Sequence, residues 1–331
     1  MKSVPQANED WRPGAPLANL RARAALLTRI REFFAVRGVL EVETPALSAA
    51  AVTDPHLASL QGRYTGPGFP AGRPMYLQTS PEFAMKRLLA AGSGPIYQLA
   101  KAFRDSEAGR LHNPEFTLLE WYRPGFDQSA MMDEVEALVA EVLGLDRRFE
   151  RVSYRDLFRR RLKVDPFEAS LEELRGCARR HGLARSEELS LPEPDAWLDL
   201  LLTHFIEPQL GVEMPCFVHD YPPSQAALAR IRPGEHPVAE RFELYIKGVE
   251  IANGFHELAD ADEQRARFER DRARRRRDGL PDVVPDERLL AALEHGLPDC
   301  SGVALGVDRL VMVALGAKSI TEVLAFPLDR A

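Results

Sequence analysis

The feature that most constrains the fold is a pair of apolar runs on either side of a highly polar loop. Residues 96–103 (IYQLAKAF) and 116–122 (FTLLEWY) are apolar and aromatic, and the loop between them carries arginines, acids and a histidine. This pattern predicts an antiparallel hairpin. The later runs PCFVHDYP, RFELYIKG and VEIANGFHEL also read as strands without alternating helices. We therefore expect an α+β fold with an antiparallel sheet rather than a doubly wound parallel one.

The composition is that of an ordinary globular protein. The chain has 331 residues and 37.0 kDa, of which 45% are hydrophobic and 28% charged. This length suits one large domain or two ordinary ones. The formal net charge of -7 and the pI of about 5.7 disfavour wide contact with a nucleic-acid backbone, which needs a dense basic surface.

Neither the cysteines nor the chain termini indicate export. The N-terminus lacks the apolar region of a secretory signal, and the apolar segment 303–316 contains two charged residues and is too short to span a bilayer. We therefore expect a cytoplasmic protein. Three cysteines without metal-like spacing are expected to be reduced and structural, namely Cys177, Cys216 and Cys300.

Helices are expected at both ends of the chain and in its middle. Asn19 is expected to cap a helix that ends near Gly38, and another helix starts at Pro81. The segment 127–205 is mostly helical in pattern. The arginine-rich run 265–279 is expected to be a helix with a solvated charged face. No low-complexity linker divides the chain.

One acid interrupts the second apolar run of the hairpin. Because side chains alternate along a strand, Phe116, Glu120 and Tyr122 share one face. A buried carboxylate needs a partner, which is either a cationic ligand or an internal lysine or arginine, and the run alone leaves both open. Arg104 and Arg110 at the loop margins suit an anion such as phosphate.

A second pair of acids lies in VEIANGFHE. Asn253, Phe255 and Glu257 share a face, whereas Glu250 is on the opposite face of a regular strand. Both acids can reach one magnesium ion only if the strand gains a residue, and Gly254 is the expected place for such a bulge. The alternative is an Asn-Gly hairpin turn. Two carboxylates with phosphate oxygens suit Mg²⁺.

Small residues alternate along a third strand. Gly302, Ala304 and Gly306 leave little side chain on one face, which lets either a ligand or a packed helix approach the backbone. Arg309 at the start of the following helix favours the ligand.

Four segments together resemble the class II aminoacyl-tRNA synthetases in the form of the lysyl-tRNA synthetases. RGVLEVETP resembles motif 1, FRDSEAGRLHNPEFTLLEWY motif 2, SGVALGVDRL motif 3, and KGVEIANGFHEL the lysine-type signature. They follow the family's order and cover most of the chain from about Leu20 to Arg330. The resemblance implies a catalytic core over 19–331 after an N-terminal segment 1–18, with an antiparallel sheet flanked by helices. Motif 1 implies a homodimer.

The resemblance also implies ATP as co-substrate with Mg²⁺. Arg104 would hold the α-phosphate and the substrate carboxylate, and Asn113 and Phe116 would meet the adenine. His112 and Arg309 would face the outer phosphates. The expected catalytic residues are Arg104 and Arg309, and the expected ATP-binding residues are Arg104, Asp105, Ser106, His112, Asn113, Phe116, Glu250, Ile251, Gly306 and Arg309.

For the amino acid, the resemblance implies an acidic pocket. Glu120 and Tyr122 would take the side-chain ammonium of a lysine-like substrate, and Glu82 would bind its other amine. Glu250 and Glu257 would be the magnesium ligands. The residues expected at the amino acid are Ser80, Pro81, Glu82, Glu120, Tyr122, Asn253, Phe255, Glu257 and Ala304.

Three departures from the synthetases shift the expected function. The anticodon-binding OB domain that precedes motif 1 in lysyl-tRNA synthetases is absent from this sequence, which together with the acidic charge disfavours tRNA. Ala304 stands where motif 3 usually has glycine. Ser106 stands where members often have glutamate, with Glu107 next, so either residue is a candidate for the adenine amino group.

These departures, with VTDPHL, AERFEL and PDCSGVALGVDRLVM, resemble the lysyl-synthetase paralogues that modify elongation factor P. The resemblance implies activation of (R)-β-lysine by ATP as an aminoacyl-adenylate, followed by transfer to the ε-amino group of a lysine on elongation factor P. No side chain is identified as the general base.

Three alternatives are considered. One is a truncated lysyl-tRNA synthetase that still charges tRNA. Another is an inactive paralogue that senses amino acids, which is disfavoured because the arginines and acids expected at ATP and metal are all present. The third is an amide synthetase on the same fold, which fits Glu120 and Tyr122 poorly because its substrate side chain is acidic.

Overall fold

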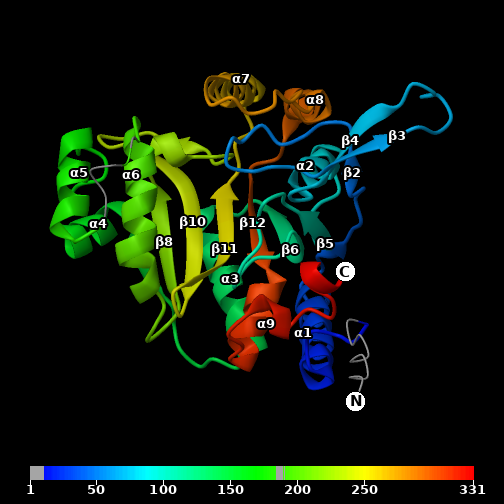
Figure 1. The fold of residues 1–331 in the computed structure, drawn as a ribbon, viewed down its shortest axis with the longest axis horizontal. Helices are drawn as coiled ribbons and strands as arrows, with labels where there is room; N and C mark the ends of the chain where they lie inside the picture. The colour runs from blue at the N-terminus through cyan, green and yellow to red at the C-terminus, as the bar shows by residue number, and fades with distance from the viewer. Residues whose placement is uncertain (1–10, 184–188, 190) are drawn as a thin grey trace, which may run out of the picture.

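A computed structural model describes residues 11–183, 189 and 191–331, and one large sheet runs across it (Figure 1). The strand order is β1-β5-β6-β12-β11-β10-β8-β7, with β9 paired to β10 off this path. The bounds are β1 (Leu40–Glu41), β5 (Ile96–Phe103), β6 (Glu115–Pro124), β7 (Glu150–Ser153), β8 (Cys216–Tyr221), β9 (Ile231–Arg232), β10 (Val238–Ile246), β11 (Val249–His256) and β12 (Cys300–Gly306).

The strand directions confirm the expected α+β fold. The six strands from β5 to β8 in the sheet order are antiparallel to their neighbours, and only the edge strands β1 and β7 pair in parallel. The predicted hairpin is formed by β5 and β6. Gln98, Glu120, Ala304 and Asn253 are direct neighbours across four strands, so residues predicted for one site lie in one row.

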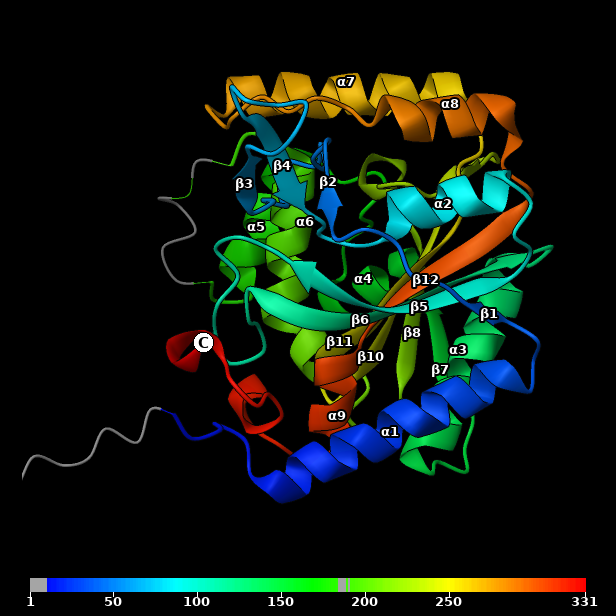
Figure 2. The same ribbon diagram turned by 90° about the vertical axis from the view of Figure 1, so that its right-hand side faces the viewer.

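Helices cover both faces and one end of the sheet (Figure 2). The helices α1, α3 and α9 lie on one face, and α2, α7 and α8 lie over the other, while α4 to α6 pack beside β7 and β8. The bounds are α1 (Leu17–Ala35), α2 (Glu82–Ala90), α3 (Gln128–Leu143), α4 (Tyr154–Leu162), α5 (Leu171–Arg180), α6 (Pro194–Leu201), α7 (Ala261–Arg277), α8 (Glu287–Gly296) and α9 (Val307–Leu315).

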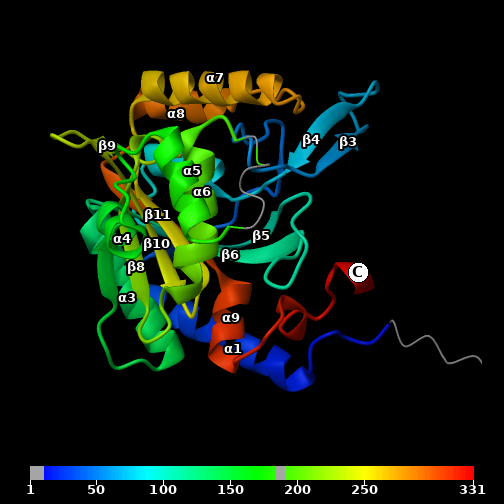
Figure 3. The ribbon, with the colours of Figure 1, turned by 60° about the vertical axis from the view of Figure 1, so that its left-hand side comes forward.

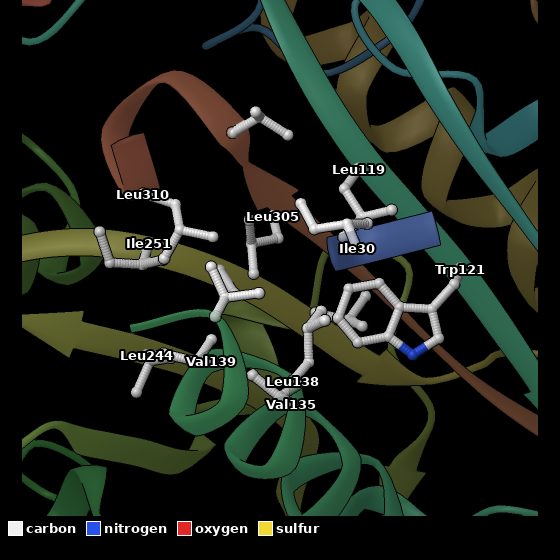
Figure 4. Close-up of a cluster of buried hydrophobic side chains, with 14 of the residues drawn as sticks. Ile30, Leu119, Trp121, Val135, Leu138, Val139, Leu244, Ile251, Leu305 and Leu310 are labelled. Atoms are coloured by element: carbon white, nitrogen blue, oxygen red, sulfur yellow. The ribbon is translucent and has the colours of Figure 1, made fainter. Parts of the chain in front are cut away.

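The largest hydrophobic core explains why an acid occurs in the apolar run of β6. Leu119 and Trp121 are fully buried against α1 and α3 (Figure 4). Burying side chains of this size stabilises the fold by about 2 kcal/mol each. Because faces alternate, Glu120 and Tyr122 must point to the opposite side of the sheet. The core therefore orients the acid away from itself.

Some expected boundaries are wrong. Helix α1 begins at Leu17, with Pro16 before it, because the Asn19 side chain donates a hydrogen bond to the carbonyl of Glu322 instead of capping the helix. The helix thus starts inside the predicted segment 1–18, of which residues 1–10 lie outside the described part. By contrast, the segment 127–205 is mostly helical as expected, with the short strand β7 inside it.

The arginine-rich helix α7 is only partly solvated. Arg267 is buried and its Nη1 donates to the carbonyls of Ala227 and Ala229, each at 2.8 Å. Arg275 is also buried and donates to the carbonyl of Asp54. The expectation of a plain solvated face is therefore wrong at these two positions. Their hydrogen bonds hold α7 in place over one face of the sheet.

A small second sheet, built from strands between residues 47 and 77, projects from the fold. It has the order β2-β4-β3, with β2 (Leu47–Ser48), β3 (Gln61–Tyr64) and β4 (Arg73–Leu77). Figure 3 shows the β3–β4 hairpin extending away from the main sheet.

The cysteine prediction is confirmed, since all three cysteines are free and buried. Among the residues that the structure describes, no helix combines the length and apolar character needed to cross a membrane.

Candidate active site

A cavity of 1130 Å³ lies over the sheet face that carries Glu120. Its walls come from β6, β10, β11 and β12, from α2, α6 and α7, and from the segment around β2. This volume is large for a ligand pocket and leaves room for a nucleotide together with an amino acid. The predicted residues that line it are Ser80, Pro81, Glu82, Arg104, His112, Asn113, Phe116, Glu250, Ile251, Asn253, Phe255, Ala304, Gly306 and Arg309.

The predicted residues Glu120, Tyr122 and Glu257 do not line the cavity but are buried behind its wall. Glu120 lies behind Ser80 and is held by two hydroxyl groups. The Tyr122 hydroxyl donates to Oε1 and the Ser80 hydroxyl donates to Oε2, both at 2.7 Å. Ser80 Oγ in turn accepts the backbone N–H of Glu82 at the start of α2. In the described part of the chain, no lysine or arginine forms an ion pair with Glu120. Of the two partners left open by the sequence, a ligand cation is therefore the one that fits.

The electrostatics of Glu120 follow from its burial. Its pKa is raised to about 8, mainly by desolvation and also by the neighbouring carboxylates Glu82 and Glu257, while the hydrogen bonds from Tyr122 and Ser80 oppose the rise. With this pKa, Glu120 is mostly protonated at neutral pH when the pocket holds no cation. An ammonium group beside it would favour the ionised form, and the role of Glu120 as its partner stays a prediction.

A lysine that the sequence analysis missed lies at the same end. Lys86 is 2% exposed, and its Nζ is 2.6 Å from Glu82 Oε1 and 2.6 Å from Glu257 Oε2. The backbone N–H of Gly302 also donates to Glu257. The available signal was the spacing of Glu82 and Lys86, four residues apart on one helix face. Two of the predicted substrate acids are thus already joined by an internal cation.

The opposite end of the cavity is basic. The Arg104 guanidinium lies 5.1 Å from the centre of the Phe116 ring. Arg309, at the start of α9, donates to the carbonyl of Glu250 at 2.9 Å and reaches its Oε2 at 3.2 Å. Its Nη2 also lies 2.6 Å from His112 Nε2. Two guanidinium groups, an imidazole and an aromatic face converge as the nucleotide prediction requires.

The imidazole at this end is arranged as an acceptor. Burial lowers the pKa of His112, and the nearby Arg309 lowers it further. The neutral ring can therefore accept the guanidinium N–H at Nε2 while its other nitrogen remains a donor.

The bulge predicted in β11 exists but at a different residue. Ile251 is the extra residue between Glu250 and Ala252, whereas Gly254 pairs regularly with Phe242. The bulge puts Ile251 into the core while Glu250 lines the cavity. The prediction of Gly254 as its place is wrong, and so is the Asn-Gly hairpin, because the strand continues through both residues. Glycine at 254 instead makes room for the Phe242 ring, because a Cβ added there would lie 2.3 Å from the ring.

The two acids predicted for magnesium differ in their surroundings. The side chain of Glu250 is 40% exposed beside Arg309, whereas that of Glu257 is 1% exposed beside Lys86. No three His, Cys, Asp or Glu side chains gather as a metal site within residues 11–183, 189 and 191–331. A magnesium ion beside Glu250, with phosphate oxygens completing its ligands, is still a prediction. Its contact with Glu257 stays a prediction.

Asn113 contacts protein at both ends of its side-chain amide. Its Nδ2 donates to the carbonyl of Glu115 at 2.6 Å, and its Oδ1 accepts the backbone N–H of Leu328 at 3.0 Å. This side chain therefore ties the motif 2 loop to the C-terminal segment. The expected contact of Asn113 with the adenine edge stays a prediction.

The choice between Ser106 and Glu107 has a geometric answer. Glu107 lines the cavity and lies 3.8 Å from Arg104. Ser106 and Asp105 are exposed and do not line it, and the Ser106 N–H donates to the Asp105 carboxylate. Glu107, which is absent from the predicted residues, is thus the better placed of the two for an adenine amino group.

Of the small residues in β12, Gly302 is required by its neighbours. A Cβ added to Gly302 would lie 2.3 Å from Cε1 of Tyr122 and 2.5 Å from Oε1 of Glu257. Ala304, between Glu120 and Asn253 in the sheet, does face the cavity. Close approach to Tyr122 and Glu257 thus accounts for glycine at 302, whereas a Cβ at Gly306 would make only ordinary contacts.

Asp308 is a further residue that the sequence analysis missed. Its Oδ2 accepts the backbone N–H of Thr117 at 2.7 Å, and its Oδ1 lies 2.5 Å from Nη1 of Arg23 in α1. This buried carboxylate fixes the start of α9 against β6. It thereby sets the position of Arg309 relative to Phe116.

The sequence pattern of the tRNA synthetases class II (D, K and N) matches residues 9–330. The chain belongs to this family. Class II synthetases use ATP, in agreement with the basic end of the cavity. The resemblance inferred from the four motifs is thereby confirmed.

Relatives of this class II synthetase are similar over nearly their whole length. A protein from Yersinia enterocolitica named elongation factor P–(R)-β-lysine ligase is 55% identical over 321 residues, covering 97% of this chain and 98% of the relative. Proteins of the same name from Edwardsiella ictaluri and Proteus mirabilis are each 54% identical with the same coverage.

Proposed function

We propose that this chain activates (R)-β-lysine with ATP and transfers it to the ε-amino group of a lysine on elongation factor P. One observation carries the proposal. The buried Glu120 is held by Tyr122 and Ser80, pairs with no lysine or arginine of the described residues, and lies behind the wall of the cavity whose other, arginine-lined end suits a nucleotide. The names of the relatives support the choice of amino acid and acceptor.

In the first step, an oxygen of the substrate carboxylate attacks the α-phosphorus of ATP, and pyrophosphate leaves. Arg104 stabilises charge on the α-phosphate, and Arg309 with His112 binds the outer phosphates. Glu250, with Glu257 as the second predicted ligand, would hold Mg²⁺, which neutralises phosphate charge when bound. Catalysis at this step is mainly orientation and charge stabilisation by groups already in place.

In the second step, the acceptor amine attacks the acyl carbon, the bond to AMP breaks, and the amine loses a proton. A free lysine with a pKa of roughly 10.4 is neutral only about once in a thousand at pH 7. Deprotonation must therefore be assisted, and the departing adenylate phosphate is the base that we propose, because no side chain is assigned to this role.

We further propose that the reaction is carried by one catalytic domain over 19–331 in a cytoplasmic homodimer. Motif 1 spans residues 37–45 and includes β1, where Leu40 is 55% exposed, and Val36 directly before the motif is 81% exposed. Apolar side chains with this exposure suit a second copy of the chain. Equilibrium sedimentation of wild type and Leu40→Glu tests the dimer, which the substitution should weaken.

The function is tested by pyrophosphate exchange with (R)-β-lysine and α-lysine in parallel, followed by mass spectrometry of elongation factor P incubated with each. We expect exchange to favour (R)-β-lysine and the factor to gain one β-lysyl group. If exchange instead favours α-lysine, tRNA becomes aminoacylated and elongation factor P stays unmodified, the alternative of a truncated lysyl-tRNA synthetase would be favoured. Absence of exchange with either amino acid would refute adenylation.

A further inference from the structure

The amino-acid end of the cavity contains more negative than positive side chains. Glu82 and Glu257 form ion pairs with Lys86, and Glu120 lies close enough to both carboxylates for their charges to raise its pKa. Glu82 lies on the cavity wall, and the other three side chains are nearly fully buried. When all four groups are ionised, three carboxylates and one ammonium leave two negative charges.

We propose that Lys86 is a built-in counter-cation that matches this pocket to amino acids with two ammonium groups. This proposal rests on the function proposed above and deepens it. A ligand with two ammonium groups brings the cluster to neutrality, whereas a ligand with one leaves a buried carboxylate without a cation, which is costly. Lys86 occupies Oε1 of Glu82 and Oε2 of Glu257, so the remaining oxygens are directed to other partners.

The surroundings of Lys86 argue against a role in helix packing alone. It projects from the buried face of α2 between Met85 and Leu89, which are 0% and 2% exposed. An apolar residue would be the cheaper choice at such a position, because burying an ammonium group requires compensation. The ion-pair partners of Lys86 are two acids predicted to meet the substrate. Its charge therefore serves the pocket.

Lys86 acts as a positioning residue through these two acids. Without its charge, Glu82 and Glu257 would face each other across a dry space and repel. They would separate or rotate, and Glu82 would lose the orientation that presents it to the substrate amine. Binding of the amino acid should therefore suffer more than binding of ATP.

The test is calorimetric titration without ATP or Mg²⁺, which removes any effect through metal binding. The two ligands are (R)-β-lysine and 3-aminohexanoic acid, its analogue without the terminal amine. The variants are Lys86→Met, Lys86→Arg, and Lys86→Met combined with Glu257→Gln. Circular dichroism and the melting temperature check that each variant folds.

We expect Lys86→Met to weaken (R)-β-lysine binding by roughly tenfold or more and to reduce the preference over the monoamine. The double variant loses one charge of each sign, so it should bind (R)-β-lysine more tightly than Lys86→Met does. Lys86→Arg should retain part of the preference. The KM for ATP should change less than the KM for the amino acid in each variant.

Two results would overturn the proposal. Unchanged preference in Lys86→Met would show that the charge is not used, and a double variant that binds no better than Lys86→Met would refute the charge balance. If Lys86→Met does not fold, the double variant decides alone. If wild type binds and activates (R)-β-lysine but the variants do not give the expected results, the inference about Lys86 is refuted and the proposed function is not. If wild type binds no (R)-β-lysine, the proposed function fails as well.

Discussion

The two ends of the cavity recognise opposite charges with different degrees of closure. At the acidic end, the side chains of Lys86 and Glu257 are 2% and 1% exposed. At the basic end, those of Arg104 and Arg309 are 27% and 21% exposed. Water screens the arginines in part, so they can bind several phosphate oxygens without depending on one geometry. The closed end cannot tolerate an unmatched charge.

This difference indicates where specificity is decided. A site built to bind a polar group can reject an analogue without that group by roughly 10⁴, because its own buried partners are left unpaired. An analogue that leaves Glu120 unpaired incurs this penalty because Glu120 is buried, whereas Arg309 is partly exposed to water. We therefore expect changes at the acidic end to alter the choice of amino acid, and changes at the basic end to alter the rate with every amino acid.

The largest effect is expected for Glu120→Gln. Loss of the charge that pairs with the terminal ammonium should lower kcat/KM for (R)-β-lysine by roughly 10³ or more in pyrophosphate exchange. The KM for ATP should change by less than about threefold. The matched control is Glu115→Gln on the same strand, where the side chain is 53% exposed, and it should behave as wild type. Equal losses in both variants would contradict the comparison.

Arg309→Ala should have the next largest effect. Removing a guanidinium that stabilises phosphate charge should lower exchange by roughly 10²-fold. Calorimetric binding of (R)-β-lysine without ATP should remain close to wild type, since Arg309 lies at the other end. Arg288→Ala, at another position of the cavity wall, serves as the control. A loss of amino-acid binding in Arg309→Ala would mean that the two ends are not separate.

The pH dependence separates the ends without mutation. Because burial raises the pKa of Glu120 to about 8, its ionised fraction rises roughly 50-fold between pH 6 and pH 8. The KM for (R)-β-lysine should fall correspondingly with rising pH and level off above 8, while the KM for ATP changes little. In Glu120→Gln the slope should disappear. A flat profile in wild type would show that Glu120 is ionised throughout.

The smallest effect is expected for Glu107→Gln. If this side chain meets the adenine amino group, its loss should raise the KM for ATP by roughly threefold, the scale of one exposed hydrogen bond. Ser106→Ala should leave the KM for ATP unchanged, because Ser106 does not line the cavity. The reverse pattern, measured by exchange at varied ATP, would restore Ser106 as the contact.

Strand parity made much of the site predictable from the sequence. The alternation in FTLLEWY puts Glu120 and Tyr122 opposite the core residues Leu119 and Trp121, and the structure confirms this division. The need for a bulge between Glu250 and Glu257 followed from the same rule. Motif order indicated which other segments share the site.

The remainder depends on contacts between distant segments. Lys86 pairs with Glu257, which is 171 positions away in the numbering of the chain, and no local pattern joins them. The bulge lies at Ile251 rather than at Gly254, because packing of the apolar side chain outweighs the usual preference for glycine. Asp308 reads locally as a surface residue of a helix start, although it is buried against Thr117.

The bulge at Ile251 also links the stability of the hydrophobic core to the orientation of Glu250, a predicted magnesium ligand. Ile251 packs beside Leu305 and Leu310 (Figure 4), and straightening the strand would exchange it with Glu250, which would insert a carboxylate among aliphatic side chains. Burial of Ile251 in the hydrophobic core thus fixes the orientation of Glu250, whose own side chain lies outside that core. A substitution such as Ile251→Ser, although it changes no group predicted to bind phosphate, would weaken the packing that holds the bulge. The Glu250 side chain would then lose its orientation toward the cavity.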